Sequence, residues 1–202
     1  KESCVLAEMA ACGEIIYEIV GLLTPMTAEI ALPLYVAVST DTGCFVYANT
    51  TAHTHQVAAA LIDTGIAVAG VNKALFRTKS RTRLAMEAWM AEWAEYYDND
   101  RVVIMQIPRS LCLDYKATEA DVEELSSLAA LVAGTDCGVT LRELEPGKVK
   151  ISLRTGPRVN ATKVCALLGG GGHAAAAGAT LSGTLSEAKQ AVLQAIDMVV
   201  GE

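Results

Sequence analysis

The sequence ALLGGGGHAAAAGATL, at residues 166–181, sets four consecutive glycines and one histidine between an apolar segment and a run of alanines. A flexible linker would be polar and flanked by serine, proline or charged residues. Both flanks here are apolar, which favours their burial. Because small residues let two backbones pack at close range, the stretch predicts a tightly packed loop inside a folded domain.

The same loop has the composition of an anion-binding site. Successive peptide N–H groups of Gly169, Gly170, Gly171 and Gly172 would form a concave site, and the alanine turn beside His173 would add N-terminal N–H groups. His173 is the one side chain of the loop that can donate to a phosphate. A loop that serves packing alone, with a histidine bonded to a carbonyl, is an equal alternative on these residues.

The segments around the loop indicate an α/β unit over residues 100–202. Strand patterns occur at residues 101–107, 137–144, 148–156 and 179–181. Helix patterns occur at residues 119–134, 160–169 and 185–200, the second of them capped by Asn160. The strand that contains Arg154 leads through a short helix directly into the glycine loop.

Arg154 is a candidate phosphate ligand. In its strand Val149, Ile151 and Leu153 point one way, and the polar side chains, Arg154 among them, point the other. A guanidinium is the natural bidentate partner of a phosphate. A surface arginine on an edge strand would have the same surroundings in the sequence, so that alternative stays open.

Residues 1–72 are expected to belong to a parallel α/β layer. Helices are predicted at residues 11–23 and from about Thr51 to Gly65, with a buried strand at residues 34–38 that leads to Asp41. Open α/β sheets bind ligands at the carboxyl ends of their strands, and a carboxylate there suits Mg²⁺ or Mn²⁺. Asp41 is therefore the candidate catalytic metal ligand. The alternative is an aspartate that only organises the following turn.

Residues 73–99 differ in character and are expected to form a helical connector. Four residues at near-helical spacing are interpreted as a core-facing stripe and not as a base-stacking platform: Ala85, Trp89, Trp93 and Tyr96. The basic residues between positions 73 and 83 are interpreted as a solvated helix face and not as a phosphate contact.

Composition excludes several classes of protein. The chain has 202 residues, 52% of them apolar, and a net charge of −7, which argues against a protein that coats duplex nucleic acid. No apolar run is long enough to span a bilayer, so no membrane partner is expected. Six cysteines without a CxxC pair predict reduced, buried thiols in a cytoplasmic protein and make zinc an unfavoured metal.

Two motifs together resemble a known family. GGGGHAAAAG following VKISLRT is similar to the signature of the DHH-associated C-terminal domain of DHH-family phosphoesterases. LYVAVSTDTGCFVYANTT, with ALIDTG after it, resembles the last catalytic motif of that family. The group that resembles it best is the bacterial nano-RNases, or oligoribonuclease and 3′-phosphoadenosine-5′-phosphate phosphatases. The resemblance implies the end of a parallel-sheet catalytic domain (1–72), a helical connector (73–99) and a smaller, mixed-sheet substrate-binding domain (100–202).

The resemblance also implies a site. Asp41 would bind one of two manganese (or magnesium) ions that activate water. Arg154, the four glycines and His173 would hold the phosphate and terminal nucleotide of the substrate. The substrate would be a short single-stranded RNA or a small phosphorylated nucleotide. The aspartate-rich motif, a further aspartate and the DHH triplet of the family are not in this sequence. The chain alone is therefore expected to be inactive and not to bind the ions as a pair. A non-catalytic nucleotide-binding fragment or regulatory module is the alternative, and a homodimer is left open.

Overall fold

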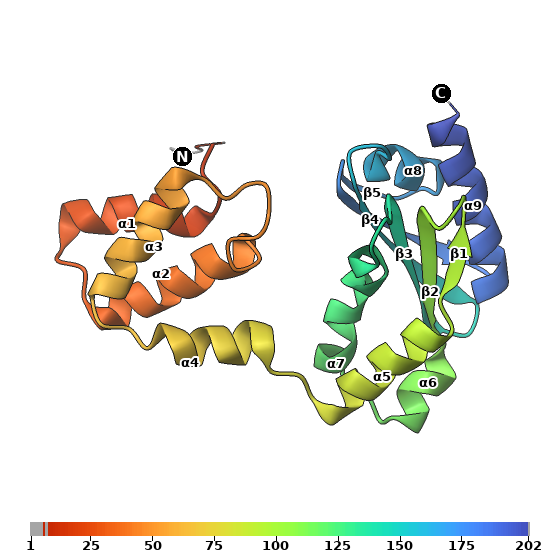
Figure 1. The fold of residues 1–202 in the computed structure, drawn as a ribbon, viewed down its shortest axis with the longest axis horizontal. Coiled ribbons are helices and arrows are strands. Elements are labelled where there is room, and N and C mark those ends of the chain that lie inside the picture. The colour runs from red at the N-terminus through yellow and green to blue at the C-terminus, as the bar shows by residue number, and fades with distance from the viewer. Residues whose placement is uncertain (1–5, 7, 202) are drawn as a thin grey trace. The chain divides into compact units, whose positions relative to one another are not determined.

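The computed structural model describes residue 6 and residues 8–201, and the chain divides into two compact units, Lys1–Thr78 and Lys79–Glu202 (Figure 1). The described part of the first unit is helical. It contains α1 (Cys12–Leu23), α2 (Ala28–Asp41), α3 (Ala52–Asp63) and α4 (Val68–Asn72), which continues into the π-helical turn η1 (Lys73–Arg77). The predicted helix at residues 11–23 is thus confirmed.

The first unit has a small core between α2 and α3. Its buried members are Ala11, Ala31, Leu34, Tyr35, Val38, Val57, Ala58 and Leu61. Helix α1 packs closely on α2 at Gly13, where a Cβ would lie 3.1 Å from the Cβ of Ala37. Helix α3 begins with the predicted cap, because Thr51 Oγ1 accepts from the Thr54 backbone N–H at 3.2 Å.

The strand predicted at residues 34–38 is wrong, because these residues lie inside α2. Their apolar run is short, and a short run does not distinguish a buried strand from a buried helical face. In the structure Leu34, Tyr35 and Val38 are buried together with Ala31, at the i, i+3, i+4 and i+7 spacing of a helix. The parallel α/β layer expected in residues 1–72 is therefore absent from the described residues of this unit.

The second unit is built on a six-stranded mixed sheet, which confirms the α/β class and the mixed-sheet expectation. The strand order is β1-β2-β3-β4-β6-β5, and only the β2–β3 pair is parallel. The strands are β1 (Glu95–Tyr97), β2 (Val102–Ile107), β3 (Cys137–Glu145), β4 (Lys148–Thr155), β5 (Gly171–His173) and β6 (Ala176–Ser182).

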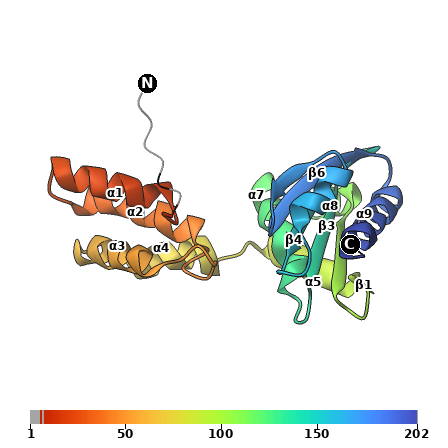
Figure 2. The same cartoon turned by 90° about the horizontal axis from the view of Figure 1, so that it is seen from above.

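The two faces of this sheet differ in their cover. One face carries the larger core, formed with α8 (Ala161–Leu167) and α9 (Leu185–Val200). The other face is covered over β2 and β3 by α5 (Arg81–Glu92), α6 (Arg109–Asp114), α7 (Glu119–Glu123) and the 3₁₀ helix η2 (Glu124–Leu131). Figures 1 and 2 show α9 on one side of the sheet and α5 and α7 on the other. On this second face Lys150, Thr180, Gly171 and His173 are exposed.

The expected connector is divided between the two units. Helix α5 belongs to the second unit, where Met86 and Met90 are fully buried against β2. The predicted core-facing stripe is confirmed only at Trp89, which packs against the core that contains these methionines. Helix α5 ends at Glu92 and leaves Trp93 62% exposed and Tyr96 48% exposed.

The thiols are less uniformly buried than expected. Cys137 and Cys165 lie in the larger core of the second unit, whereas Cys12 is exposed, and Cys4 lies outside the described residues. Burial raises the pKa of the Cys137 thiol to about 12. Within the described ranges, none of the helices is long and apolar enough to cross a bilayer.

Candidate phosphate-binding face

The structure places Arg154 and His173 in one row across three strands. Arg154 of β4 pairs with Ala176 of β6, and Ala176 pairs in turn with His173 of β5. Directly paired residues point to the same face of a sheet. The two basic side chains therefore flank the methyl group of Ala176, with their Cα atoms about 10 Å apart, which is two strand spacings.

Arg154 has most of its donors free. Its Nη1 donates to the carbonyl of Leu153 at 3.0 Å, and no carboxylate forms an ion pair with it in the part of the chain that the structure describes. A guanidinium has five N–H donors, so Arg154 can still bind an anion bidentately. His173 is exposed and, within the same described residues, its side chain has no hydrogen-bond partner.

The turn that joins β5 to β6 is held against the end of β4. The carbonyl of Ala174 accepts from Thr155 Oγ1 at 3.0 Å and from the Ala161 N–H at 2.8 Å, and the carbonyl of Ala175 accepts from the Thr155 N–H at 2.9 Å. This turn is a two-residue hairpin connection and not the start of a helix, so the expected helical N–H groups beside His173 are wrong. The anchored turn fixes His173 relative to Arg154.

The four glycines of the loop have three different roles. Gly169, with a φ of +74°, and Gly170 end α8, since their N–H groups donate to the carbonyls of Ala166 (3.1 Å) and Cys165 (2.8 Å). The expected series of four free N–H groups is therefore wrong for these two. Gly171 and Gly172 lie in β5, where they pair with β6.

Close approach explains two of the glycines. A Cβ on Gly170 would lie 2.7 Å from the Cα of Ala179 and closer still to the carbonyl oxygen of Gly178. A Cβ on Gly172 would lie 2.6 Å from the carbonyl oxygen of Ala176, and the φ of this residue is +149°. Gly171 faces open space, with no atom within 4 Å of the corresponding position. The loop thus combines packing with one open position on the face that carries Arg154.

Two hollows are lined by residues that precede or follow Arg154 in the chain. One, of about 340 Å³, lies at the end of β4 and is lined by Thr155, Gly156, Pro157, Val159, Asn160, Ala174 and Ala175. The other, of about 300 Å³, lies further along the sheet and is lined by Lys150, Ile151, Gly170, Gly178, Ala179 and Thr180. Apart from the loop glycines, the sequence did not identify these residues as candidate ligand-binding residues. The signal was present in the alternation of KVKISLRT, which places Lys150 and Ser152 on the same face as Arg154.

Asp41 lies at a different kind of position from the one predicted. It is the last residue of α2, exposed, and its carbonyl accepts from Asn49 Nδ2 at 3.2 Å. The turn after it contains Cys44 and Phe45, both with φ near +60°. Such left-handed conformations are costly for side chains other than glycine and cluster at functional sites. The turn therefore supports Asp41 as a candidate, although no strand presents it.

The described residues do not form a metal centre. No three His, Cys, Asp or Glu side chains among them converge on one point. His53 Nε2 lies 3.6 Å from Glu18 Oε1, and His55 stacks on the ring of Phe45 at 5.2 Å between centroids, so the two histidines contact different groups. Asp41 could thus supply a single carboxylate to a manganese or magnesium ion, and a two-ion site does not fit the described residues.

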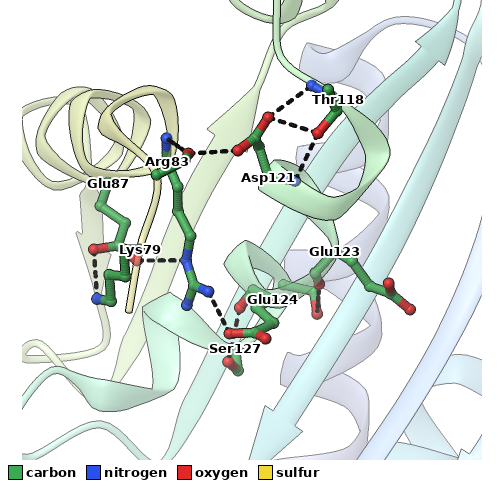
Figure 3. A network of polar contacts seen from close by, with 10 residues as sticks. Lys79, Arg83, Glu87, Thr118, Asp121, Glu123, Glu124 and Ser127 are labelled. Carbon is green, nitrogen blue, oxygen red and sulfur yellow. Dashed lines mark hydrogen bonds and ion pairs between the residues drawn. The ribbon is translucent and has the colours of Figure 1, made fainter. Parts of the chain in front are cut away.

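Two of the basic residues at the start of α5, Lys79 and Arg83, form ion pairs within the protein. Figure 3 shows Arg83 between Glu87 and Glu124, with Nε at 3.1 Å from Glu87 Oε1. Lys79 Nζ lies 2.7 Å from Glu87 Oε2, and Ser80 Oγ donates to Asp121, the residue that caps α7 together with Thr118. These contacts join α5 to α7 and η2, which makes Lys79 and Arg83 poor candidates for phosphate binding.

The chain is similar to proteins of one family. The DHHA1 domain family matches residues 99–202. The chain is 35% identical over 190 residues, 93% of its length, to the bifunctional oligoribonuclease and PAP phosphatase NrnA of Thermus thermophilus, of which it spans 56%. An exopolyphosphatase-related protein of Bacteroides fragilis has the same fold, with a TM-score of 0.88 and 21% identity over 96% of this chain and 58% of that one.

The chain thus spans a little over half the length of each of these two proteins. The matched domain begins at residue 99 and contains the whole Arg154–Ala176–His173 row together with the glycine loop. On the evidence of the matched domain and the 35% identity, the chain belongs to the DHH family and carries that family's DHHA1 domain.

Proposed function

We propose that this chain is the substrate-binding part of a metal-dependent DHH-family hydrolase that acts on short oligoribonucleotides, 3′-phosphoadenosine-5′-phosphate, or both. The observation that carries the proposal is the row in which Arg154 and His173 flank Ala176 on an open face of the DHHA1 domain. The oligoribonuclease and PAP phosphatase activity of the Thermus relative supports the choice of substrate class.

In this proposal each residue of the row has its own part. Arg154 binds a phosphate through two N–H donors, and His173 donates a further hydrogen bond from the opposite side of Ala176. Gly171 leaves room for the ligand above β5 because it carries no side chain. The anchored turn at Ala174 holds these groups in place before the ligand arrives, which lowers the entropy that binding costs.

Asp41 is proposed as one ligand of a divalent cation, manganese or magnesium. When bound, such ions supply the activation of water for attack on phosphorus. Since Asp41 belongs to no cluster of three or more possible metal ligands in the described ranges, the chain by itself is proposed to bind nucleotides without hydrolysing them. A cytoplasmic setting remains part of the proposal, in keeping with free thiols at the five described cysteines.

The test is to measure the binding of a 5′-phosphorylated diadenylate to the 202-residue chain by isothermal titration calorimetry. Arg154→Lys and His173→Ala should each weaken binding about tenfold or more, because a hydrogen bond to a charged group contributes about 1.5–3 kcal/mol. Arg109→Lys is the matched control, since Arg109 is exposed and follows β2 at the end of the sheet away from Arg154.

Two results would overturn the proposal. One is binding by both variants that equals binding by the parent chain, with circular dichroism showing that they fold. The other is an equal loss in the Arg109→Lys control, which would indicate general electrostatic attraction. The same samples incubated with Mn²⁺ should yield no mononucleotide, and hydrolysis abolished by Asp41→Ala would disprove the proposed inactivity of the chain alone.

A further inference from the structure

The face that carries Arg154 continues along β4 for two more rows of residues. Ser152 pairs with Gly178 of β6, which pairs with Gly171 of β5. In the next row Lys150 lies between Arg142 of β3 and Thr180 of β6. A row of small residues thus separates two rows that carry cationic side chains.

Lys150 is an exposed cation without a partner. Within the described chain no carboxylate lies within ion-pair distance of its Nζ. The charge of Lys150 acts on Glu119, whose pKa is lowered mainly by hydrogen bonds from Arg142 and to a smaller extent by Lys150. Arg142 already holds that carboxylate through two hydrogen bonds of 2.6 and 2.7 Å. Arg142 and Glu119 neutralise each other, and Glu123 lines the same small pocket as Lys150 but forms no ion pair with it in the described residues.

Space for a ligand lies beside Lys150. The hollow of about 300 Å³ has Lys150 and Thr180 on its rim and the backbone of Gly178 in its lining. This volume is at the lower end of the range for small-molecule sites, about 300–1,000 Å³. Because Gly178 has no side chain, a flat base or a sugar can approach the backbone of the sheet at this point.

A second, smaller pocket of about 70 Å³ opens between the sheet and α7 and shares Lys150 with the hollow. Ser152 lines it, is only 8% exposed, and has no side-chain hydrogen-bond partner in the described residues. The Nε of Arg142, in the same lining, is also buried without a partner within those residues. Buried polar groups are normally paired, so the unpaired Nε of Arg142 points to a polar ligand at this end of the face. The Ser152 hydroxyl is not fully buried and is a free donor beside it.

The spacing of the two cations suits a ligand with more than one phosphate. Lys150 and Arg154 are four residues apart on one strand, so their Cα atoms lie about 13 Å apart. Ser152 lies between them, with Gly178 beside it in the neighbouring strand. Two phosphates of one strand, with a nucleoside over the small residues between them, would engage both cations at once.

We propose that Lys150 binds a second phosphate of a short single-stranded oligonucleotide whose first phosphate is held by Arg154 and His173, and that the hollow over Gly178 holds the nucleoside between them. This inference rests on the proposed function. It makes the face selective for length, because a mononucleotide reaches only the Arg154 row. A lysine suits this role, since its point charge accepts a phosphate in several orientations.

The experiment compares two ligands, 5′-AMP and 5′-phosphorylated triadenylate, on the full 202-residue chain. Lys150→Ala should weaken triadenylate binding about threefold to tenfold, within the range for exposed and partly exposed charge pairs. It should leave the affinity for 5′-AMP within twofold of the parent. The salt dependence gives a second readout, since loss of one phosphate contact should lower the slope of log K against log salt by about 0.7 for a single strand.

Lys148→Ala is the matched control. Lys148 is exposed, lies two residues away on the same strand and carries the same charge, but its Nζ is already 3.1 Å from Glu145 Oε1. It should therefore affect triadenylate binding much less than Lys150→Ala does. Ser152→Ala should also weaken triadenylate more than 5′-AMP, by removing the unpaired hydroxyl.

The outcomes separate this inference from the proposed function. If Lys150→Ala weakens both ligands equally, or weakens triadenylate no more than Lys148→Ala, the second phosphate site is refuted. If Arg154→Lys leaves 5′-AMP binding unchanged, the proposed function fails independently of any result at Lys150. Because Lys150 is exposed, thermal unfolding of the variant should match that of the parent and exclude loss of fold as the cause.

Discussion

Alanine substitution at three adjacent glycines is expected to have opposite effects on folding and binding. A Cβ at Gly170 meets the backbone of β6, and one at Gly172 meets the carbonyl of Ala176, whereas one at Gly171 meets no atom within 4 Å. The three substitutions add the same single methyl group within three residues. Any difference between them therefore reports the local geometry and not the chemistry of the change.

The expected magnitudes follow from these contacts. Gly170→Ala forces the backbone of β6 to move, and such overpacking costs about 1–3 kcal/mol. Gly172→Ala meets a similar clash and must also hold a φ of +149°, which adds about 1–3 kcal/mol for a side chain in a sparsely populated region. Gly171→Ala should change stability by less than about 0.5 kcal/mol, as exposed substitutions usually do.

The assay is urea unfolding of the 202-residue chain by circular dichroism, with binding of 5′-phosphorylated diadenylate measured on each folded variant. Gly171→Ala should fold like the parent and bind more weakly, because its methyl group occupies the space proposed for the ligand. Equal destabilisation by Gly171→Ala and Gly170→Ala would refute the hairpin geometry. Unchanged binding by a folded Gly171→Ala chain would show that the loop serves packing alone.

Two further predictions concern stability and access in the rest of the molecule. Iodoacetamide should label exposed Cys12 on the native chain, while Cys137 and Cys165 should react only after unfolding, because burial raises the pKa of both thiols. Mass spectrometry of digests gives the order in which the cysteines are labelled. Although burial raises the pKa of Glu95, hydrogen bonds from Lys189 and two neighbouring side chains bring it below its ordinary value. Glu95 therefore contributes stability above its unfolded-state pKa of about 4.3, which is lost as the pH falls through the lower folded-state value. Glu95→Gln should thus cost about 0.5–1.5 kcal/mol at pH 7 and less at pH 3, and an equal cost at both values would contradict the assignment.

Local signals predicted most of the second unit. The alternation of Val149, Ile151 and Leu153 placed those residues in the core, and all three are fully buried. The predicted cap at Asn160 is present, with Asn160 Oδ1 accepting from the Lys163 N–H at 3.1 Å. The closing helix runs from Leu185 to Val200 as predicted. Each of these features depends on residues within one turn or one strand, so a single sequence carries the information.

Features that depend on pairing between distant segments were harder to predict. In α2 the run around Leu34 fits either a strand or a helix, and only burial against α3 determines which one forms. In α5 the sequence favoured an aromatic stripe as the inward face. In the structure Met86 and Met90 are buried with Trp89 packed beside them, and the helix ends at Glu92, before Trp93 can extend the stripe.

The candidate site shows the same division between local and distant information. The sequence identified Arg154 and His173 separately, each from its own residue type and neighbours. Their placement in one row follows from two strand registers, and both registers pass through Ala176, a residue with no chemistry of its own. The strand pairing also gives the loop glycines different surroundings that the sequence does not reveal. Of Gly170, Gly171 and Gly172, only Gly171 has open space where a side chain would lie. The pairing extends the same face to Lys150, whose charge would otherwise be one exposed lysine among many. For this reason the most informative variants compare residues of the same type at different positions in the sheet, such as Gly170 with Gly171 and Lys148 with Lys150.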